Sequence, residues 1–425
     1  MAPVSSLLAA GFGAFSALWA TNVTAPYDPL SLAISLKHGV VAVGGRDCPD
    51  NSENSLFYYD VQKGKSAGPS VPGLSQIKLA VDAETLVVAG MGWNKLKGTT
   101  FLGGPGNFHQ TEAVSPSMET PVDISNDGKL SAFLYEPNPD EAHLNNRTGT
   151  LQLVDDSGKV TFTHKVAGQG AFDPQLVTVA AHKRGDVYTI GALFGSVNTI
   201  VDYNYAEKSG KVVWSEKDAV GGGSIALNGD GTLFALTSND GLQVDVYARS
   251  TEKGARAAFS KISTLTPPKS GMNVMNPLTL AMSQGTSESP TLAVVWGDQD
   301  GTTVILRAHV INGSAVDQIW ESSQVCQGGG SFNYVLPRGL SVTAKGELVV
   351  LGSWGCTEDS GSMMVFKGNH GDGKPIFSAT FPGQVWAVDA RVSDEGTEAY
   401  VAAGSWKSQS GSSPSQTSMF RASMF

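Results

Sequence analysis

The chain has 425 residues, 50 of them glycine, and 41% of its residues are hydrophobic while only 16% are charged. A disordered chain would carry more charge and fewer apolar residues, so this composition indicates a turn-rich globular protein. The formal net charge of −10 argues against nucleic-acid binding, which needs a basic face. No apolar run reaches the roughly 18 residues that a membrane span requires.

One pattern recurs along the whole chain: an alternating apolar strand, a tight polar turn, and a second apolar strand that ends in small residues. It occurs eight times, at residues 32–45, 79–93, 122–136, 177–192, 225–238, 278–297, 340–354 and 388–406. Turns such as NDG, GDG and DEG supply the Asn, Asp and Gly that a hairpin reversal needs. Each copy is therefore predicted to be a β-hairpin.

Two further strands follow each hairpin. GTLQLVDDSGK (149–159) is an example of the third strand, and KPIFSATF (374–381) in a later unit is an example of the fourth. The turn glycines Gly39 and Gly396 lie 357 residues and seven repeats apart, which gives a mean period of 51 residues. Four strands per unit at a period near 50 are typical of a β-propeller blade.

We therefore predict an all-β protein that forms one domain over residues 1–425, a single β-propeller of eight four-stranded blades. Seven blades is the alternative if the weak hairpin of the second or sixth unit belongs to a neighbouring blade. The blades are expected at approximately residues 30–73, 74–119, 120–170, 171–223, 224–274, 275–334, 335–383 and 384–425.

The segment VDYNYAEKSGKVVWSEK (201–217) resembles the repeat of the quinoprotein-dehydrogenase-like propellers, in which a Gly-Lys turn precedes a Val-x-Trp strand. The turns SNDGKLSAF (125–133) and LNGDGTLFAL (227–236) resemble YVTN/WD-like repeats. The resemblance implies a propeller fold and no particular activity, because a vicinal Cys-Cys pair and a haem motif are both missing. We therefore predict no cofactor.

The last unit supplies three strands before the chain ends, so its blade needs a fourth. GAFSALWATN (13–22) matches KPIFSATFPG (374–383) closely, which predicts that the N-terminal strand closes the ring. Alternatively, residues 7–20 form the core of a cleaved signal peptide and TNVTA (21–25) closes the ring. A signal peptide would make the protein a secreted one, and a closing strand is compatible with a cytoplasmic one, so both compartments stay open.

In a propeller, the first strand of each blade lines the central channel, and the loop after the second strand lies on the face called here the top. The ends of the second strands place aromatic residues or arginine around the channel mouth. One further tryptophan comes from the first strand of the eighth blade. These candidates for ligand binding are Arg46, Trp93, Trp354, Trp386 and Trp406, with Tyr135, Phe194 and Trp296 at the same expected level. Such a ring suits a ligand with flat apolar faces. The alternative is that each tryptophan fills the gap between its blade and the next.

The first strands alternate between apolar residues and small or polar ones, and the period of two places the polar set on one side, toward the channel. This set includes Asp123, Ser341, Asp389 and Arg391. Asp389 and Arg391 are candidates for ligand binding or acid–base catalysis. A channel lined by solvated side chains is the competing interpretation.

Cys326 and Cys356 both fall on the top of the seventh blade, where a disulfide would brace the rim, and Cys48 falls on the first blade. The seven histidines do not converge, so we predict no metal site. The acidic loops at 46–55, 136–143 and 356–361 are weak candidates for calcium, because they lack the regular spacing of a calcium loop.

The leading functional prediction is a binding module whose channel mouth takes a small organic or glycan ligand, or a partner protein. The alternative is a cofactor-independent enzyme, a lyase, isomerase or hydrolase, that uses Asp389 and Arg391 beside the tryptophans. A desolvated aspartate there would have a pKa raised toward that of a working acid.

Overall fold

The computed structural model of the protein describes most of the chain between residues 12 and 424. The described residues are 12–23, 27–47, 54–72, 74, 76–94, 97–104, 107–115, 122–135, 147–168, 176–179, 186–194, 197–217, 223–238, 242–250, 258–268, 275–285, 289–298, 302–325, 337–354, 360–406 and 414–424. Within them, no helix is both long and apolar enough to cross a membrane.

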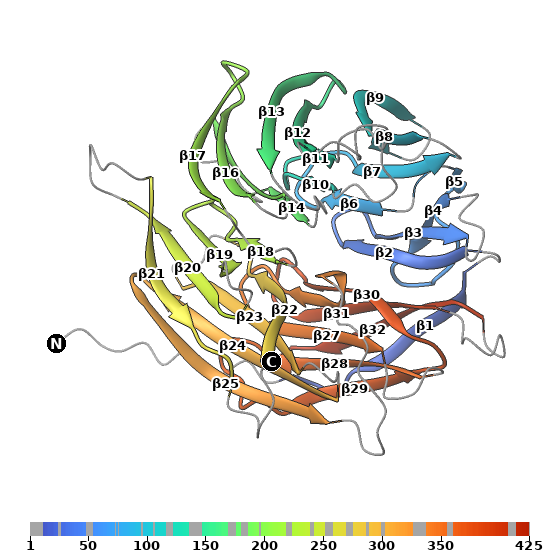
Figure 1. The fold of residues 1–425 in the computed structure, drawn as a ribbon. Coiled ribbons are helices and arrows are strands. Elements are labelled where there is room, and N and C mark those ends of the chain that lie inside the picture. The colour runs from blue at the N-terminus through green and yellow to red at the C-terminus, as the bar shows by residue number, and fades with distance from the viewer. Residues whose placement is uncertain are drawn as a thin grey trace.

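The described residues form eight antiparallel sheets of four strands each, arranged as the blades of a ring (Figure 1). Blade 1 contains β2 (Tyr27–Ser35), β3 (Val40–Asp47), β4 (Asn54–Asp60) and β5 (Val71–Pro72). Blade 2 contains β6 (Gln76–Ala80), β7 (Val87–Asn94), β8 (Lys97–Gly104) and β9 (Asn107–Ser115). Blade 3 contains β10 (Val122–Ile124), β11 (Leu130–Tyr135), β12 (Arg147–Asp155) and β13 (Val160–Gly168). Blade 4 contains β14 (Leu176–Val179), β15 (Val187–Leu193), β16 (Val197–Asn204) and β17 (Ser209–Lys217).

The second half of the ring repeats this plan. Blade 5 contains β18 (Ile225–Leu227), β19 (Leu233–Thr237), β20 (Val244–Arg249) and β21 (Phe259–Leu265). Blade 6 contains β22 (Met275–Met282), β23 (Thr291–Asp298), β24 (Thr303–Asn312) and β25 (Ala315–Val325). A 3-10 turn, η2 (Pro337–Gly339), leads into blade 7, which contains β26 (Leu340–Val342), β27 (Leu348–Trp354), β28 (Gly361–Lys367) and β29 (Pro375–Phe381). Blade 8 contains β30 (Val385–Val392), β31 (Glu398–Ser405), β32 (Gln416–Ser423) and the N-terminal β1 (Ser16–Asn22).

The first strands of the blades form the inner wall of the ring. β2 lies beside β6, β6 beside β10, and so on through β14, β18, β22 and β26 to β30, which lies beside β2 again. The prediction of eight four-stranded blades is therefore confirmed, and the seven-bladed alternative is wrong, because the hairpins of blades 2 and 6 each belong to a sheet of their own.

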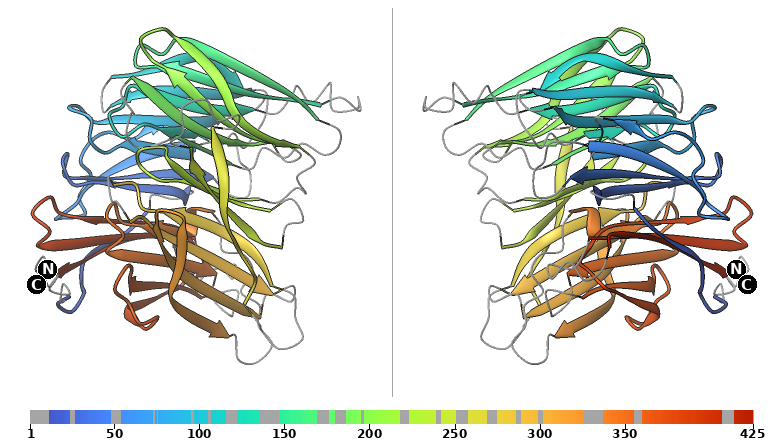
Figure 2. Two further views of the ribbon diagram at one scale, coloured as in Figure 1. Left: turned by 90° about the vertical axis from the view of Figure 1, so that its left-hand side faces the viewer. Right: turned by 90° about the vertical axis from the view of Figure 1, so that its right-hand side faces the viewer.

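The ring is closed by the N-terminal strand, as predicted. β1 pairs antiparallel with β32, from Ser16 opposite Arg421 to Asn22 opposite Gln416. Figure 2 shows this dark-blue strand lying against the red C-terminal blade. The Trp19 indole of β1 then reaches blade 1, where its Nε1 donates a hydrogen bond to the Val61 carbonyl at 2.8 Å. Closure thus joins the two ends of the chain without a covalent link.

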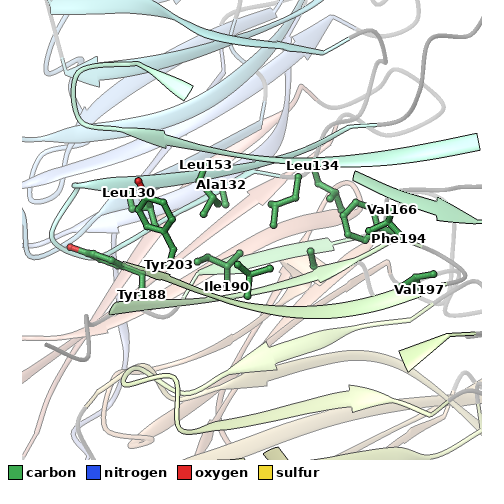
Figure 3. Close-up of a cluster of buried hydrophobic side chains, with 13 residues drawn as sticks. Leu130, Ala132, Leu134, Leu153, Val166, Tyr188, Ile190, Phe194, Val197 and Tyr203 are labelled. Carbon is green, nitrogen blue, oxygen red and sulfur yellow. The ribbon is translucent and has the colours of Figure 1, made fainter. Parts of the chain in front are cut away.

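The hydrophobic cores lie between neighbouring blades. Between blades 3 and 4, for example, Leu130 and Leu153 meet Tyr188, Ile190 and Tyr203, and all five side chains are fully buried (Figure 3). Burying one such side chain stabilises the fold by about 1.5–3 kcal/mol. Because every blade shares its two faces with its neighbours, the stability of each blade depends on the ring being complete.

Aromatic side chains of several fourth strands pack onto the next blade. The ring of Trp214, on β17, lies 5.0 Å from that of Phe234 in blade 5. Trp320, on β25, stacks at 5.3 Å on Phe366 of blade 7 and donates to the Gly368 carbonyl at 2.7 Å. A β-bulge flanks Trp214 and Trp320, as well as Trp19 of β1. Since a bulge bends and twists its strand, it turns these side chains toward the following blade.

Candidate functional site

The glycines at the ends of the second strands are required by the packing of the next blade. A Cβ atom on Gly404 of β31 would lie 2.7 Å from Cβ of Pro29 in blade 1. A Cβ atom on Gly352 of β27 would lie 2.7 Å from Cγ1 of Val385 in blade 8. Both glycines therefore let the first strand of the following blade approach closely. Their recurrence reflects blade packing and carries no functional information.

Trp386 and Trp406 form a parallel stack at the top end of blade 8. Their ring centroids lie 3.8 Å apart, the angle between the planes is 4°, and both residues are half-buried. The Trp406 Nε1 donates to the Pro29 carbonyl of blade 1 at 3.1 Å, and the Trp386 Nε1 donates to Oε1 of Gln384 at 3.1 Å. Both indole N–H groups are satisfied, so the pair is fixed in orientation and presents apolar surface at the junction of blades 8 and 1.

Trp386 reaches this position through a β-bulge. The pairing of β30 with β31 passes from Val385–Ser405 to Ala387–Gly404, which leaves Trp386 as the extra residue. Blades 1 and 6 have bulges in the same place, with Leu30 and Leu278 as the extra residues. A bulge re-aims one side chain without disturbing the rest of the strand.

The other predicted mouth residues are placed only by their backbones. Trp354 ends β27 opposite Gly361, Trp93 pairs with Gly98 near the end of β7, and Arg46 pairs with Asp28 near the end of β3. These strand ends lie at the top of blades 7, 2 and 1, but the three side chains lie outside the described part of the chain. Their role in ligand binding stays a prediction.

Trp296 and Phe194 are core residues, in contrast to their expected place at the channel mouth. Both side chains are fully buried. Trp296 pairs with Pro277 directly before the bulge of β22, as Ser405 pairs with Val385 in blade 8, so it occupies the position of Ser405 and not that of Trp406. A shift of one residue moves a strand side chain to the other face of its sheet. Trp296 accordingly packs into the core between blades 5 and 6.

Asp389 joins three blades and is almost fully buried. Its Oδ2 accepts a hydrogen bond from the backbone N–H of Ile34 in blade 1 at 2.8 Å and forms an ion pair with Nη2 of Arg391 at 3.2 Å. Its Oδ1 accepts the hydroxyl of Ser341 in blade 7 at 3.2 Å and the N–H of Ala390 at 2.9 Å. The structure thus brings the three predicted residues Ser341, Asp389 and Arg391 together, and both carboxylate oxygens are occupied.

Two serines of the inner wall make the same kind of contact. The Ser31 hydroxyl oxygen of blade 1 accepts the N–H of Ile77 in blade 2 at 3.0 Å, and that of Ser224, just before β18, accepts the N–H of Leu280 in blade 6 at 3.1 Å. An inner strand has one edge without a pairing strand, so a polar side chain from the preceding blade satisfies its free N–H.

Asp123, half-buried on β10, lies between Val122 and Ile124, which point into the core between blades 2 and 3.

Arg338 and Gln384 are mouth residues that the sequence analysis did not find. Arg338, on η2 before blade 7, donates through Nη1 to the carbonyl of the bulge residue Leu30 in blade 1 at 3.2 Å. Its Nη2 donates to Oε1 of Gln76 in blade 2. Arg338 therefore reaches across the top of the channel. In blade 7, Arg338 stands at the position that Leu30, Leu278 and Trp386 occupy in blades 1, 6 and 8. A charged residue at this otherwise apolar position is the feature of the sequence that could have identified it.

The predicted disulfide and the calcium loops fall largely outside the described residues, as do Cys48, Cys326 and Cys356. Among the residues that the structure describes, no group of three His, Cys, Asp or Glu side chains is close enough to hold a metal ion.

No protein-family model matches the chain, and no curated protein matches it. Solved structures share its fold. Sqt1 from Saccharomyces cerevisiae is 13% identical, with a TM-score of 0.58 over 97% of this chain and 99% of that one. The WD40 domain of SCAP from fission yeast is 9% identical, with a TM-score of 0.49 over 97% and 98% of the two chains. The quinohemoprotein alcohol dehydrogenase ADHIIG from Pseudomonas putida is 10% identical, with a TM-score of 0.48 over 96% and 76%.

The eight-bladed ring confirms the predicted β-propeller, and the likeness to Sqt1 concerns the fold alone. Identities near 10% carry no activity, ligand or partner from those proteins to this one. The chain is a β-propeller.

Proposed function

We propose that this protein is a binding module whose recognition surface is the channel mouth at blades 7, 8 and 1. The observation that carries the proposal is the stacked pair Trp386 and Trp406, which lies half-buried at the top of blade 8. Tryptophan faces of this kind bind flat apolar groups of small organic molecules, sugars or partner proteins.

The pair is held by one hydrogen bond to each indole, and these bonds fix its orientation. Trp406 is tied to blade 1 through Pro29, and Trp386 is tied to the buried Gln384. A surface that is already rigid loses little conformational entropy when a ligand binds, so more of the contact energy appears as affinity. The β-bulge at Trp386 directs its ring toward Trp406.

An enzyme that uses Asp389 and Arg391 receives less support. An acid or base must offer an atom to the substrate, whereas each oxygen of Asp389 accepts two contacts from the protein. The fold also favours binding, because propellers such as the WD40 domains commonly present their faces to ligands or partner proteins.

The proposal is tested by comparing wild-type protein with Trp386→Ala on a glycan and metabolite array and in partner capture with quantitative mass spectrometry. We expect Trp386→Ala to lose at least tenfold of the binding that wild-type protein shows. The matched control is Val212→Ala, at an exposed apolar residue of β17 in blade 4, which should keep that binding. Retention of every interaction by Trp386→Ala would place the recognition surface elsewhere.

A further inference from the structure

The inner strand of blade 2 directs a lysine into the channel. Ile77 and Leu79 of β6 are buried in the core between blades 1 and 2, so the alternating residues Gln76, Lys78 and Ala80 face the other way. Gln76 and Ala80 are buried, whereas Lys78 is exposed. Because the other edge of β6 is covered by β7, an exposed side chain on β6 opens into the channel.

Lys78 forms no hydrogen bond or ion pair within the described part of the chain. Of the nearby inner-wall carboxylates, Asp389 already has Arg391 as its ion-pair partner. Asp123 lies on the neighbouring strand β10, between two residues that pack toward blade 2. The ammonium of Lys78 is thus a solvated cation within the channel of a protein whose formal net charge is −10.

A second cation is anchored on another residue of the same strand. The guanidinium of Arg338 is anchored on Gln76, two residues before Lys78 on the same side of the same strand. Residues at that spacing have Cα atoms about 6.6 Å apart. The four-carbon stem of lysine is flexible and extends its ammonium toward a guanidinium held at Gln76. Two like charges that approach each other repel, and an anion that lies between them relieves this repulsion.

We propose that the channel mouth contains an oxyanion site in which Arg338 and Lys78 bind the carboxylate or phosphate group of a ligand. Two contacts, to oxygens of blades 1 and 2, fix the Arg338 guanidinium as a rigid group of donors, and Lys78 would contribute the mobile charge. The inference rests on the proposed binding role of the mouth and sharpens it, because the ligand would then carry an anionic group beside the flat group that stacks on Trp386.

The test is calorimetric titration of the full chain with inorganic phosphate and with succinate, each at constant ionic strength balanced by sodium chloride. We expect wild-type protein to bind at least one of them with one site per chain. Lys78→Met should weaken that binding at least fivefold, and Lys78→Arg should keep it within about twofold. Binding of phosphate alone assigns the site to phosphate groups, and binding of succinate assigns it to carboxylates.

The matched control is Lys63→Met, at an exposed lysine in the turn after β4, which should leave the binding unchanged. Equal weakening by Lys63→Met would show a general charge effect and overturn the proposal, as would the failure of wild-type protein to bind either anion at about 10 mM. Trp386→Ala should still bind the probe anion, since neither anion stacks on an indole. A failure of the proposed recognition surface is therefore distinguishable from a failure of the anion site.

Discussion

The junction between blades 4 and 5 and the junction between blades 8 and 1 solve the same packing problem with different chemistry. At the first, Arg249 of blade 5 pairs with Asp202 of blade 4 through two contacts of 2.6 and 2.7 Å, and Thr189 donates to the same carboxylate at 3.0 Å. The guanidinium also lies 4.4 Å from the centre of the Phe259 ring. These groups satisfy one another and leave little for a ligand.

At the junction of blades 8 and 1, polar side chains bind backbone groups one at a time. Asp389 accepts the N–H of Ile34, Trp406 donates to the carbonyl of Pro29, and Trp19 donates to that of Val61. This junction also has to hold the two ends of the chain together. Trp386 and Trp406 are half-buried and stack on each other, whereas Trp214, which is also half-buried, packs edge-on against Phe234 and Tyr247 of blade 5.

The two junctions separate residues that hold blades together from residues that are candidates for ligand binding. A buried charge that has its ion-pair partner close by is explained by its role in holding two blades together. The same is true of an indole that packs between two blades. Trp386 and Trp406 differ from Trp214 because their rings stack on each other and not on rings of the next blade. We therefore propose recognition at the closing junction.

The largest effect is expected from removing the closing strand. Deletion of residues 1–22 exposes the edge of β32 and the surface of blade 1 that Trp19 covers. The cost should approach the whole free energy of unfolding, about 5–15 kcal/mol for a typical protein, so cooperative thermal unfolding should disappear. Addition of a peptide with residues 12–23 should restore it. A deletion variant that unfolds cooperatively at the wild-type temperature would contradict this closure.

The ion pair of the other junction should matter next. Arg249→Leu leaves the carboxylate of Asp202 mostly buried without its cation, which should cost about 3–4 kcal/mol in the free energy of unfolding measured with urea. The double variant Arg249→Leu/Asp202→Leu should regain much of this, because no buried charge is left. Arg307→Leu serves as the control, since its partner Glu321 is 38% exposed and the pair should contribute less than about 1 kcal/mol. If the losses in the free energy of unfolding of the two single variants add up in the double variant, Arg249 and Asp202 do not act as a buried ion pair.

A histidine away from both junctions gives a pH-dependent test. His309, on β24, is buried with neither ring nitrogen bonded, and burial, together with the nearby Arg307, lowers its pKa from 6.5 to about 4. The unfolded chain then binds the proton more readily, so this contribution to stability is complete above pH 6.5 and is lost as the pH falls toward 4. The loss amounts to about 3 kcal/mol.

His309→Leu should therefore flatten the fall in the free energy of unfolding between pH 6.5 and 4. His370→Leu, at an exposed turn residue, should leave the fall unchanged. If the two variants have the same pH profile as wild-type protein, the acid sensitivity has another source.

The fold was readable from the sequence because its determinants are local. Alternation of apolar residues and turn residues such as those around Gly231 and Gly396 are sufficient to define a hairpin, and each of these glycines has a positive φ. The closing strand was readable because it resembles the fourth strand of blade 7. The brevity of β5, with only Val71 and Pro72, has no counterpart in the repeat pattern.

The candidate site was only partly readable, because its geometry depends on contacts between blades. The sequence grouped Ser341, Asp389 and Arg391 correctly on one side of the inner wall, but which N–H group Asp389 would satisfy depends on how blade 1 docks. One bulge residue moved Trp296 to the opposite face of its sheet from the one expected. Arg338 was missed because its partners are more than 250 residues away in the chain.

The central claim is that Asp389 joins blades while Trp386 binds ligand, and one parallel measurement tests it most directly. Melting temperature and array binding per folded molecule should be determined for Trp386→Ala and Asp389→Ala. We predict that Trp386→Ala costs about 1 kcal/mol or less in stability and loses binding. Asp389→Ala should cost about 2–3 kcal/mol, because it strands Arg391 and the N–H of Ile34, and it should keep binding. The reverse pattern, with binding lost in Asp389→Ala and kept in Trp386→Ala, would contradict this account.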